Sequence, residues 1–302
     1  MSSDVTALRS DESAFGTKPL RIQDSSLITS WRQFRRGPGA LAGAAICLVF
    51  IALALAAPLI EPHDPYQQSL SVALQPPSPQ YWLGTDEHGR DILSRILAGA
   101  QVSLFMSLTI VALALLVGGG LGLLAGYYGG WAGGLIMRAM DVLLAMPGVL
   151  LAITVIAILG VGLENVIGAV ALESVPIFAR LARASTLSVG ESEYVSAARV
   201  VGAPDRRLLL RHVLPNITAP LIVMSTTRIA AVILIASGLS FLGLGAQPPS
   251  PEWGAMLSAG RSHLTSNPHV AVSPGIAIML AVLGFNLLGD GLRDALDPRL
   301  RS

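Results

Sequence analysis

Two ionisable residues, Glu173 and Arg228, stand inside long apolar stretches of this 302-residue sequence. If those stretches cross a lipid bilayer, each charge is costly unless it is paired or faces water, and such residues often mark the path of a solute. Counted at about 1.5 Å per helical residue, the two lie within roughly 10 Å of each other in depth, a gap that an arginine side chain can close. We therefore predict an interhelical Glu173–Arg228 pair and take both residues as translocation-path candidates. A pair that only fixes helix packing, or an arginine that reaches for the surface, is the alternative.

A second polar cluster, formed by Asp86, Glu87, His88 and Asp91, offers carboxylates and an imidazole for a metal ion. One histidine among carboxylates is more typical of a hydrated turn, so we predict no metal site there. Catalysis would need a nucleophile and a base at one depth, and the hydroxyls of the apolar stretches have no such partners. The glycine-rich segments also lack the Lys-Ser/Thr that completes a phosphate-binding loop. The sequence thus predicts no catalytic residue, no metal and no cofactor in this chain.

The composition indicates what positions these residues. Hydrophobic residues make up 52% of the chain and charged residues 13%, against roughly 25% charged residues in an ordinary soluble domain. The lone cysteine, Cys47, excludes an intrachain disulfide. A helix that spans a bilayer needs roughly 20 mostly apolar residues. Six segments qualify, so we predict an all-α integral membrane protein with six transmembrane helices: Leu41–Ile60, Val102–Tyr127, Leu135–Leu163 (bent near Pro147), Val166–Leu181, Ala219–Leu244 and Val272–Leu288.

Arginines cluster before the first of these segments, between the fourth and fifth, and after the sixth. Cytoplasmic flanks are enriched in Lys and Arg, and with six crossings all three clusters fall on one side, so we expect both termini in the cytoplasm.

The predicted topology divides the chain into three parts. Residues 1–30 form a polar cytoplasmic tail that we expect to be disordered, residues 31–101 hold the first transmembrane helix and an outer loop, and residues 102–302 form a transmembrane core with a cytoplasmic loop at 184–215.

That cytoplasmic loop has the pattern of two short helices. The segment Glu191–Val201 is typical of a helix that ends at Gly202, and a second helix begins around Pro204. Glycine closes a helix in the left-handed conformation, and proline is tolerated in a first turn. The small side chains of Ala197 and Ala198 would allow close approach to another protein. The residues alone leave two alternatives open: insertion into a groove of a partner, or an amphipathic helix that rests on lipid headgroups through its arginines.

The sequence of this loop resembles a known family. The run from Glu193 to Gly202, followed by Leu214-Pro215, is similar to the EAA loop of binding-protein-dependent ABC importer permeases. The resemblance implies a coupling helix seated in a cleft of an ATPase subunit. It assigns ATPase coupling to Glu193, Tyr194, Ser196, Ala197, Ala198, Arg199 and Gly202. Ser196 stands where the motif usually has an acidic residue, which puts one polar contact to the ATPase in question.

Two further motifs resemble the branch of that family that handles dipeptides, oligopeptides and nickel. One lies in the outer loop and contributes Gly84, Thr85, Asp86, Gly89, Arg90 and Asp91. The other comprises residues 239–254 and 289–298. The resemblance covers about residues 31–300 and implies the type I ABC importer permease fold in a bacterial inner membrane. It makes residues 81–95 and 248–261 the expected docking surface for an extracytoplasmic solute-binding protein.

The resemblance also implies the rest of the assembly. A second homologous permease would complete a heterodimer, two cytosolic ATP-binding subunits would carry ATP and Mg²⁺, and a solute-binding protein would bind outside; lipid surrounds this chain and no nucleic acid takes part. We expect import of dipeptides or oligopeptides by alternating access, with nickel or another small solute as the alternative. A secondary transporter driven by an ion gradient is a further alternative, but it would be expected to lack the docking loop and could show an internal repeat, which we do not see.

Overall fold

A computed structural model describes residues 33–35 and 37–296 of the chain. The expected disordered tail at 1–30 lies outside these residues. Helices account for nearly all regular structure in the described part, where the only β-type pairing is one isolated bridge between Thr85 and Asp91.

Five helices in the described part are long and apolar enough to cross a membrane, and a sixth crossing results if a bent helix pair is counted as one span. Helix α5 (Gly130–Leu144) and helix α6 (Gly148–Leu159) form this pair, with an angle of 88° between them. The break falls at Pro147, where the sequence predicts it. The other spans are α2 (Pro38–Ile60), α3 (Ile92–Ala114) continued by η2 (Leu115–Gly119) and α4 (Gly120–Tyr128), α7 (Leu163–Gly190), α9 (Asp205–Arg207) continued by η3 (Leu208–Val213) and α10 (Leu214–Phe241), and α12 (His269–Leu296). All six predicted segments fall on these helices.

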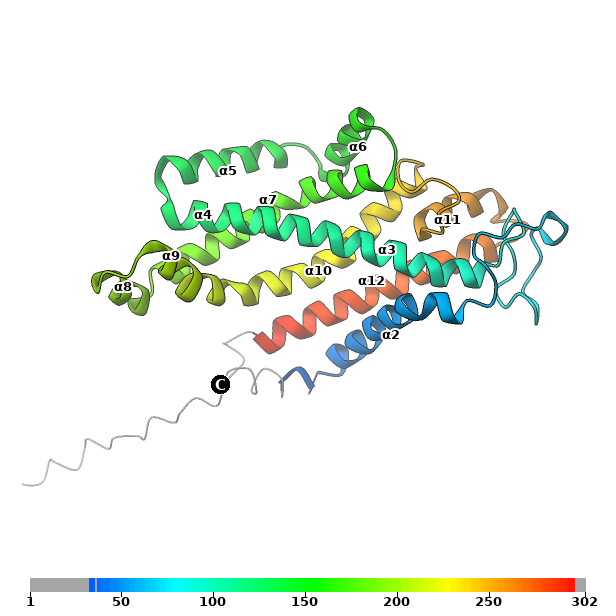
Figure 1. Ribbon diagram of the computed structural model, residues 1–302, viewed down its shortest axis with the longest axis horizontal. Coiled ribbons are helices and arrows are strands. Elements are labelled where there is room, and N and C mark those ends of the chain that lie inside the picture. The colour runs from blue at the N-terminus through cyan, green and yellow to red at the C-terminus, as the bar shows by residue number, and fades with distance from the viewer. Residues whose placement is uncertain (1–32, 36, 297–302) are drawn as a thin grey trace, which may run out of the picture.

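Helix α7 is central to the bundle, and it packs against α3, α4, α5, α6 and α10 (Figure 1). Helix α2 packs against α3 and α12 at one side of the bundle. Glycines allow the closest approach, since small residues bring helix backbones together where lipid gives no hydrophobic driving force. A Cβ at Gly118 would lie 2.3 Å from the carbonyl oxygen of Val175, and one at Gly122 would lie 2.2 Å from that of Ala179.

We expect a Gly122→Ala substitution to destabilise the bundle, because the new methyl group would overlap the α7 backbone. Overpacking of this kind costs about 1–3 kcal/mol, which lowers the thermal unfolding midpoint by several degrees. Gly120→Ala is the matched control, because a Cβ at Gly120 has no atom within 4 Å. Thermal unfolding of the two variants in detergent checks the expectation, and equal midpoints would contradict the close α4–α7 contact.

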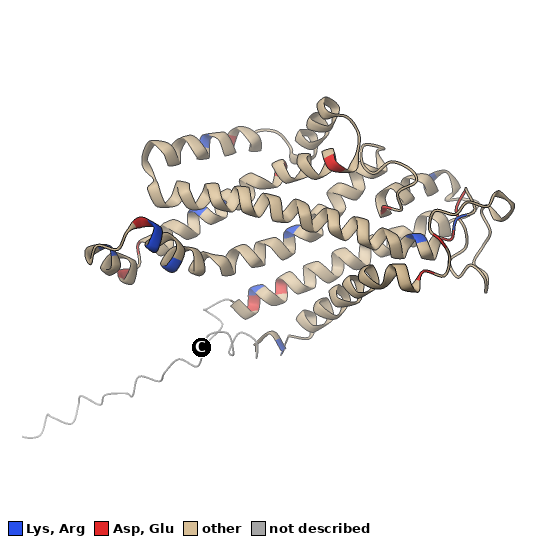
Figure 2. Cartoon of the chain, viewed as in Figure 1, with Lys and Arg blue, Asp and Glu red and all other residues tan. Residues whose placement is uncertain are grey.

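Charged residues gather at the two ends of the bundle, and few lie along the middle of the spans (Figure 2). One end carries the short helices α8 (Glu193–Val200) and α9; the first turn of α2 and the last turn of α12 point toward it (Figure 1). We call it the α8 end. The opposite end carries residues 61–91, helix α11 (Trp253–Gly260) and η4 (Arg261–His263), and we call it the loop end.

Candidate functional site

The α8 end has the two-helix arrangement that the sequence predicts. Helix α8 begins at Glu193 after Ser192, and the chain turns at Gly202, whose φ of +83° lies in the left-handed region that glycine favours. Pro204 then precedes α9. Val195 is completely buried and fixes α8, while the Tyr194 ring is half-exposed and lies 6.3 Å from the His212 ring.

The outward face of α8 carries most of the residues assigned to coupling. Ser196, Ala197 and Arg199 are exposed, and Ala198 is partly buried. The two valines that follow, Val200 and Val201, are each 87% exposed. Apolar side chains of this kind, exposed on a polar loop, mark a surface that contacts another protein or a membrane. These valines are not among the predicted coupling residues, although an apolar pair at the end of a polar helix is visible in the sequence.

Arg199 also has a contact within the chain. Its guanidinium carbon lies 6.0 Å from the centroid of the Tyr127 ring at the end of α4. The Tyr127 hydroxyl donates a hydrogen bond of 2.7 Å to Asp205. The segment that holds α8 and α9 therefore contacts the end of the second span.

The two intramembrane charges form the interhelical pair that the sequence predicts. Glu173 on α7 accepts from Arg228 on α10, and the side chains are only 12% and 11% exposed. Ser174 completes the group, because its hydroxyl accepts from Arg228 Nε at 3.1 Å and lies 3.1 Å from Glu173 Oε2. A Cβ on Gly148 would lie 2.5 Å from Glu173 Oε1, so the first residue of α6 rests on this carboxylate. The pair therefore adjoins the break between α5 and α6.

The outer-loop motif folds into a compact turn at the loop end. Gly84 and Gly89 have φ values of +79° and +71°, and a Cβ at Gly89 would lie 1.8 Å from the Ser69 carbonyl oxygen. Thr85 is buried and hydrogen-bonds to the Val72 carbonyl oxygen. Asp91 begins α3, because its side chain accepts from the Ser94 backbone N–H at 3.1 Å. The two glycines permit the tight turns of this motif, and the hydrogen bonds of Thr85 and Asp91 fix its backbone.

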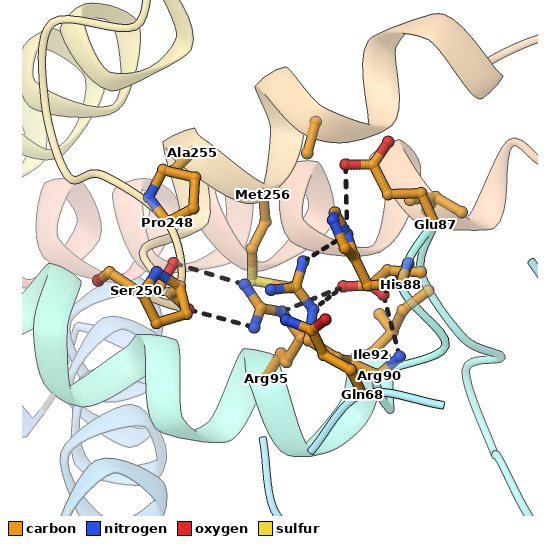
Figure 3. A pocket seen from close by; sticks show the side chains of 14 residues that line it. Gln68, Glu87, His88, Arg90, Ile92, Arg95, Pro248, Ser250, Ala255 and Met256 are labelled. Carbon is orange, nitrogen blue, oxygen red and sulfur yellow. Dashed lines mark hydrogen bonds and ion pairs between the residues drawn. The ribbon is translucent and has the colours of Figure 1, made fainter. Parts of the chain in front are cut away.

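Two buried arginines hold this turn, and one of them, Arg95, connects it to the other motif of the loop end. Asp86 accepts from Arg90 Nε at 2.6 Å and lies 3.5 Å from Arg95 Nε (Figure 3). Arg95 also donates to the carbonyl oxygens of Pro249 and Ser250, both at 3.4 Å. The sequence places both motifs on one surface, and the structure shows that they bind each other.

The second motif is anchored by Glu252 and Trp253. Glu252 is completely buried and caps α11 by accepting from the backbone N–H groups of Gly254 and Ala255 at 2.9 and 2.8 Å. Burial raises the pKa of the Glu252 carboxyl, while these hydrogen bonds oppose the rise. The Trp253 indole donates to the Ile96 carbonyl oxygen at 3.1 Å. Nowhere among the described residues do three His, Cys, Asp or Glu side chains converge on a possible metal position.

Comparisons with known proteins agree with this geometry. Residues 118–302 match the family described as the binding-protein-dependent transport system inner membrane component. The chain belongs to that family. Residues 25–77 also match the N-terminal transmembrane domain of oligopeptide transport permease C. The permease is thus a transporter subunit of a bacterial inner membrane and not an enzyme; ATP hydrolysis belongs to partner ATPases.

Several relatives resemble the permease over nearly its whole length. The glutathione transport system permease protein GsiD of Pectobacterium atrosepticum is 50% identical over 93% of this chain and 95% of its own. GsiD of Shigella sonnei is 51% identical over 90% of both chains. The dipeptide transport system permease protein DppC of Alkalihalophilus pseudofirmus is 46% identical over 91% of this chain and 92% of its own.

A solved structure shares the fold. The MetNI methionine ABC transporter in an inward-facing conformation superposes with a TM-score of 0.55, and the match covers 68% of the permease and 98% of that chain. The sequences are 16% identical, so this likeness concerns the fold alone. It confirms the type I importer permease fold that the sequence predicts.

Proposed function

We propose that the permease imports short peptides together with partner proteins. The supporting observation is the exposed apolar end of α8, which has the form of a coupling helix that inserts into an ATPase. Relatives named for glutathione, a tripeptide, and for dipeptides are 46–51% identical over at least 90% of the chain. The assembly contains a second, homologous permease as a heterodimer, two ATPase subunits that hold ATP and Mg²⁺, and a solute-binding protein.

The proposal includes an orientation in the membrane. The α8 end, with both termini, lies in the cytoplasm, and the loop end lies outside. Arginines support this assignment, because the segment between α7 and η3 carries Arg199, Arg206 and Arg207, whereas the two buried arginines of the loop end share the carboxylate of Asp86. The compact surface at residues 81–95 and 248–261 is then the docking surface for the solute-binding protein.

We place the translocation path next to Glu173 and Arg228. An ion pair inside a membrane-spanning region is costly to maintain, and such pairs are commonly retained for transport. A carboxylate beside a guanidinium matches the opposite charges at the two ends of a peptide. The same pair contacts the first residue of α6, so a solute that engages it also touches the break in the third span.

Solute-stimulated ATP hydrolysis tests the proposed function. The permease is reconstituted in lipid with its partner permease, ATPase subunits and solute-binding protein, and the ATPase rate is measured with dipeptides, glutathione or Ni²⁺. We expect stimulation of several-fold by peptides and none by Ni²⁺. Stimulation by Ni²⁺ alone would make the permease part of a nickel importer. Failure of any ATPase subunit to co-purify with the permease would contradict the importer itself.

A further inference from the structure

The loop end contains a pocket of about 410 Å³ between residues 68–95, α11 and the start of α12 (Figure 3). Small-molecule sites commonly measure about 300–1,000 Å³ and combine apolar walls with a few placed polar groups. The apolar wall here comes from Ile92, Met256 and Val270. The polar side comes from Glu87, His88 and Arg90.

Arg90 presents unused hydrogen-bond donors to this pocket. Its Nε donates to Asp86 at 2.6 Å, and its Nη2 lies 3.3 Å from His88 Nδ1. Its Nη1 has no hydrogen-bond partner among the described residues, although the guanidinium group has five N–H donors. The fork geometry of a guanidinium group suits a carboxylate. Arg90 is therefore equipped to hold the anionic end of a ligand without releasing Asp86.

Glu87 supplies the opposite charge at the edge of the pocket. Its carboxylate lies 3.5 Å from His88 Nδ1 and 3.4 Å from His263 Nε2, and its side chain is 34% exposed. An ionised carboxylate accepts about four hydrogen bonds, so these two imidazoles leave room for a ligand ammonium group.

The spacing of the two charges suits a short zwitterionic ligand. Arg90 Nη2 and Glu87 Oε1 lie 3.3 and 3.5 Å from the same atom, His88 Nδ1, so they are at most about 7 Å apart. An extended chain advances about 3.3–3.6 Å per residue, so the two ends of a dipeptide can reach both residues.

We propose that this pocket is an extracytoplasmic subsite for a zwitterionic dipeptide. The peptide carboxylate binds Arg90, the peptide ammonium group binds Glu87, and a side chain packs on Met256 and Ile92. The inference rests on the proposed function, since a peptide importer is exposed to such ligands. The subsite would hold peptide on the permease itself, within the surface where we propose that the solute-binding protein docks.

Equilibrium dialysis of the permease–ATPase complex in nanodiscs, without the solute-binding protein, tests the subsite. The probes are radiolabelled Ala-Phe, its N-acetyl form and its C-terminal amide. We expect Glu87→Gln to weaken binding of Ala-Phe about tenfold and to leave binding of N-acetyl-Ala-Phe unchanged. The amide should bind about tenfold more weakly than Ala-Phe to the native complex. Glu164→Gln, which changes an exposed carboxylate at the start of α7, is the matched control and should change nothing.

Three results would overturn the subsite: no binding of Ala-Phe, equal weakening of both peptides by Glu87→Gln, or photolabelling by a benzophenone dipeptide away from Met256 and Ile92. Crosslinking of a loop of the solute-binding protein into the pocket, with no effect of dipeptide on the crosslink yield, would also overturn it. The proposed function is judged separately on the same preparation. If peptide-loaded binding protein stimulates ATP hydrolysis while dialysis shows no binding, only the subsite fails.

Discussion

A permease with Val200→Asp and Val201→Asp is expected to bind its ATPase subunits about 30-fold more weakly and to lose solute-stimulated ATP hydrolysis. Both side chains are 87% exposed at the end of α8, so the folded permease loses no packing when they change. In the assembly they would be buried, and an unpaired carboxylate buried at an interface costs more than the ~2 kcal/mol typical of a hot-spot truncation. A cost of ~2 kcal/mol corresponds to about 30-fold, so the loss is expected to be at least this large.

Co-purification and ATPase rates measured in parallel check this expectation. Val161→Asp is the matched control: it introduces the same charge at a 55% exposed valine in the turn between α6 and α7, at the opposite end of the bundle. The control should bind ATPase and respond to solute as the native permease does. If the double variant kept its ATPase and its stimulation, α8 would not be the coupling helix, and the lipid-surface alternative would take its place.

The sequence predicts the spans well because their length is set by the bilayer, but several helices extend beyond the predicted spans. Helix α3 begins at Ile92, where the sequence indicates an amphipathic helix over Asp91–Leu104 that continues into the span predicted from Val102. Its first turns contain Arg95, which hydropathy places outside, yet carbonyl oxygens of Pro65, Pro249 and Ser250 accept hydrogen bonds from this side chain. Hydrogen bonds between residues about 30 and 150 positions apart leave no signal in a local pattern.

Proline chemistry predicts the position of the break in the third span but not its size. Pro147 lacks the N–H that would continue the helix, and the helices do separate there. The 88° angle depends on how α6 packs, with Gly148 against the Glu173 side chain. A tertiary contact of this kind is invisible in the sequence.

The residues of the candidate sites also fall into two groups: those that the sequence predicts and those that only the fold reveals. The Glu173–Arg228 pair was predictable, because charges are rare in apolar stretches and helix geometry gives their depth. Ser174 was not, because serine is common in membrane helices and its position gives no sign of a hydrogen bond to Arg228. For α8 the resemblance assigned the residues, whereas the exposure of Val200 and Val201 and the contact between Arg199 and Tyr127 depend on the fold.

Replacement of Glu173 by Gln is expected to reduce both the amount of folded permease and peptide uptake by more than tenfold. The change leaves the guanidinium group of Arg228 buried without a counter-charge. Breaking a buried pair by removing one partner costs about 3–5 kcal/mol, a large part of the stability of a typical domain. Uptake into proteoliposomes and thermal unfolding of the purified complex measure the two effects.

The double variant Glu173→Gln, Arg228→Gln separates a transport role from a packing role. It buries no net charge and keeps polar groups that can hydrogen-bond to each other and to Ser174, so the unfolding midpoint should return close to the native value. Uptake per folded permease should stay more than tenfold low, because the charged ends of a peptide no longer meet opposite charges. Asp141→Asn, Arg180→Gln is the matched control, since that pair joins α5 and α7 at 2.6 Å but its side chains are 59% and 55% exposed, and an exposed pair contributes little. If uptake recovered together with stability in the double variant, Glu173 and Arg228 would serve only to join α7 to α10, and the translocation path would lie elsewhere.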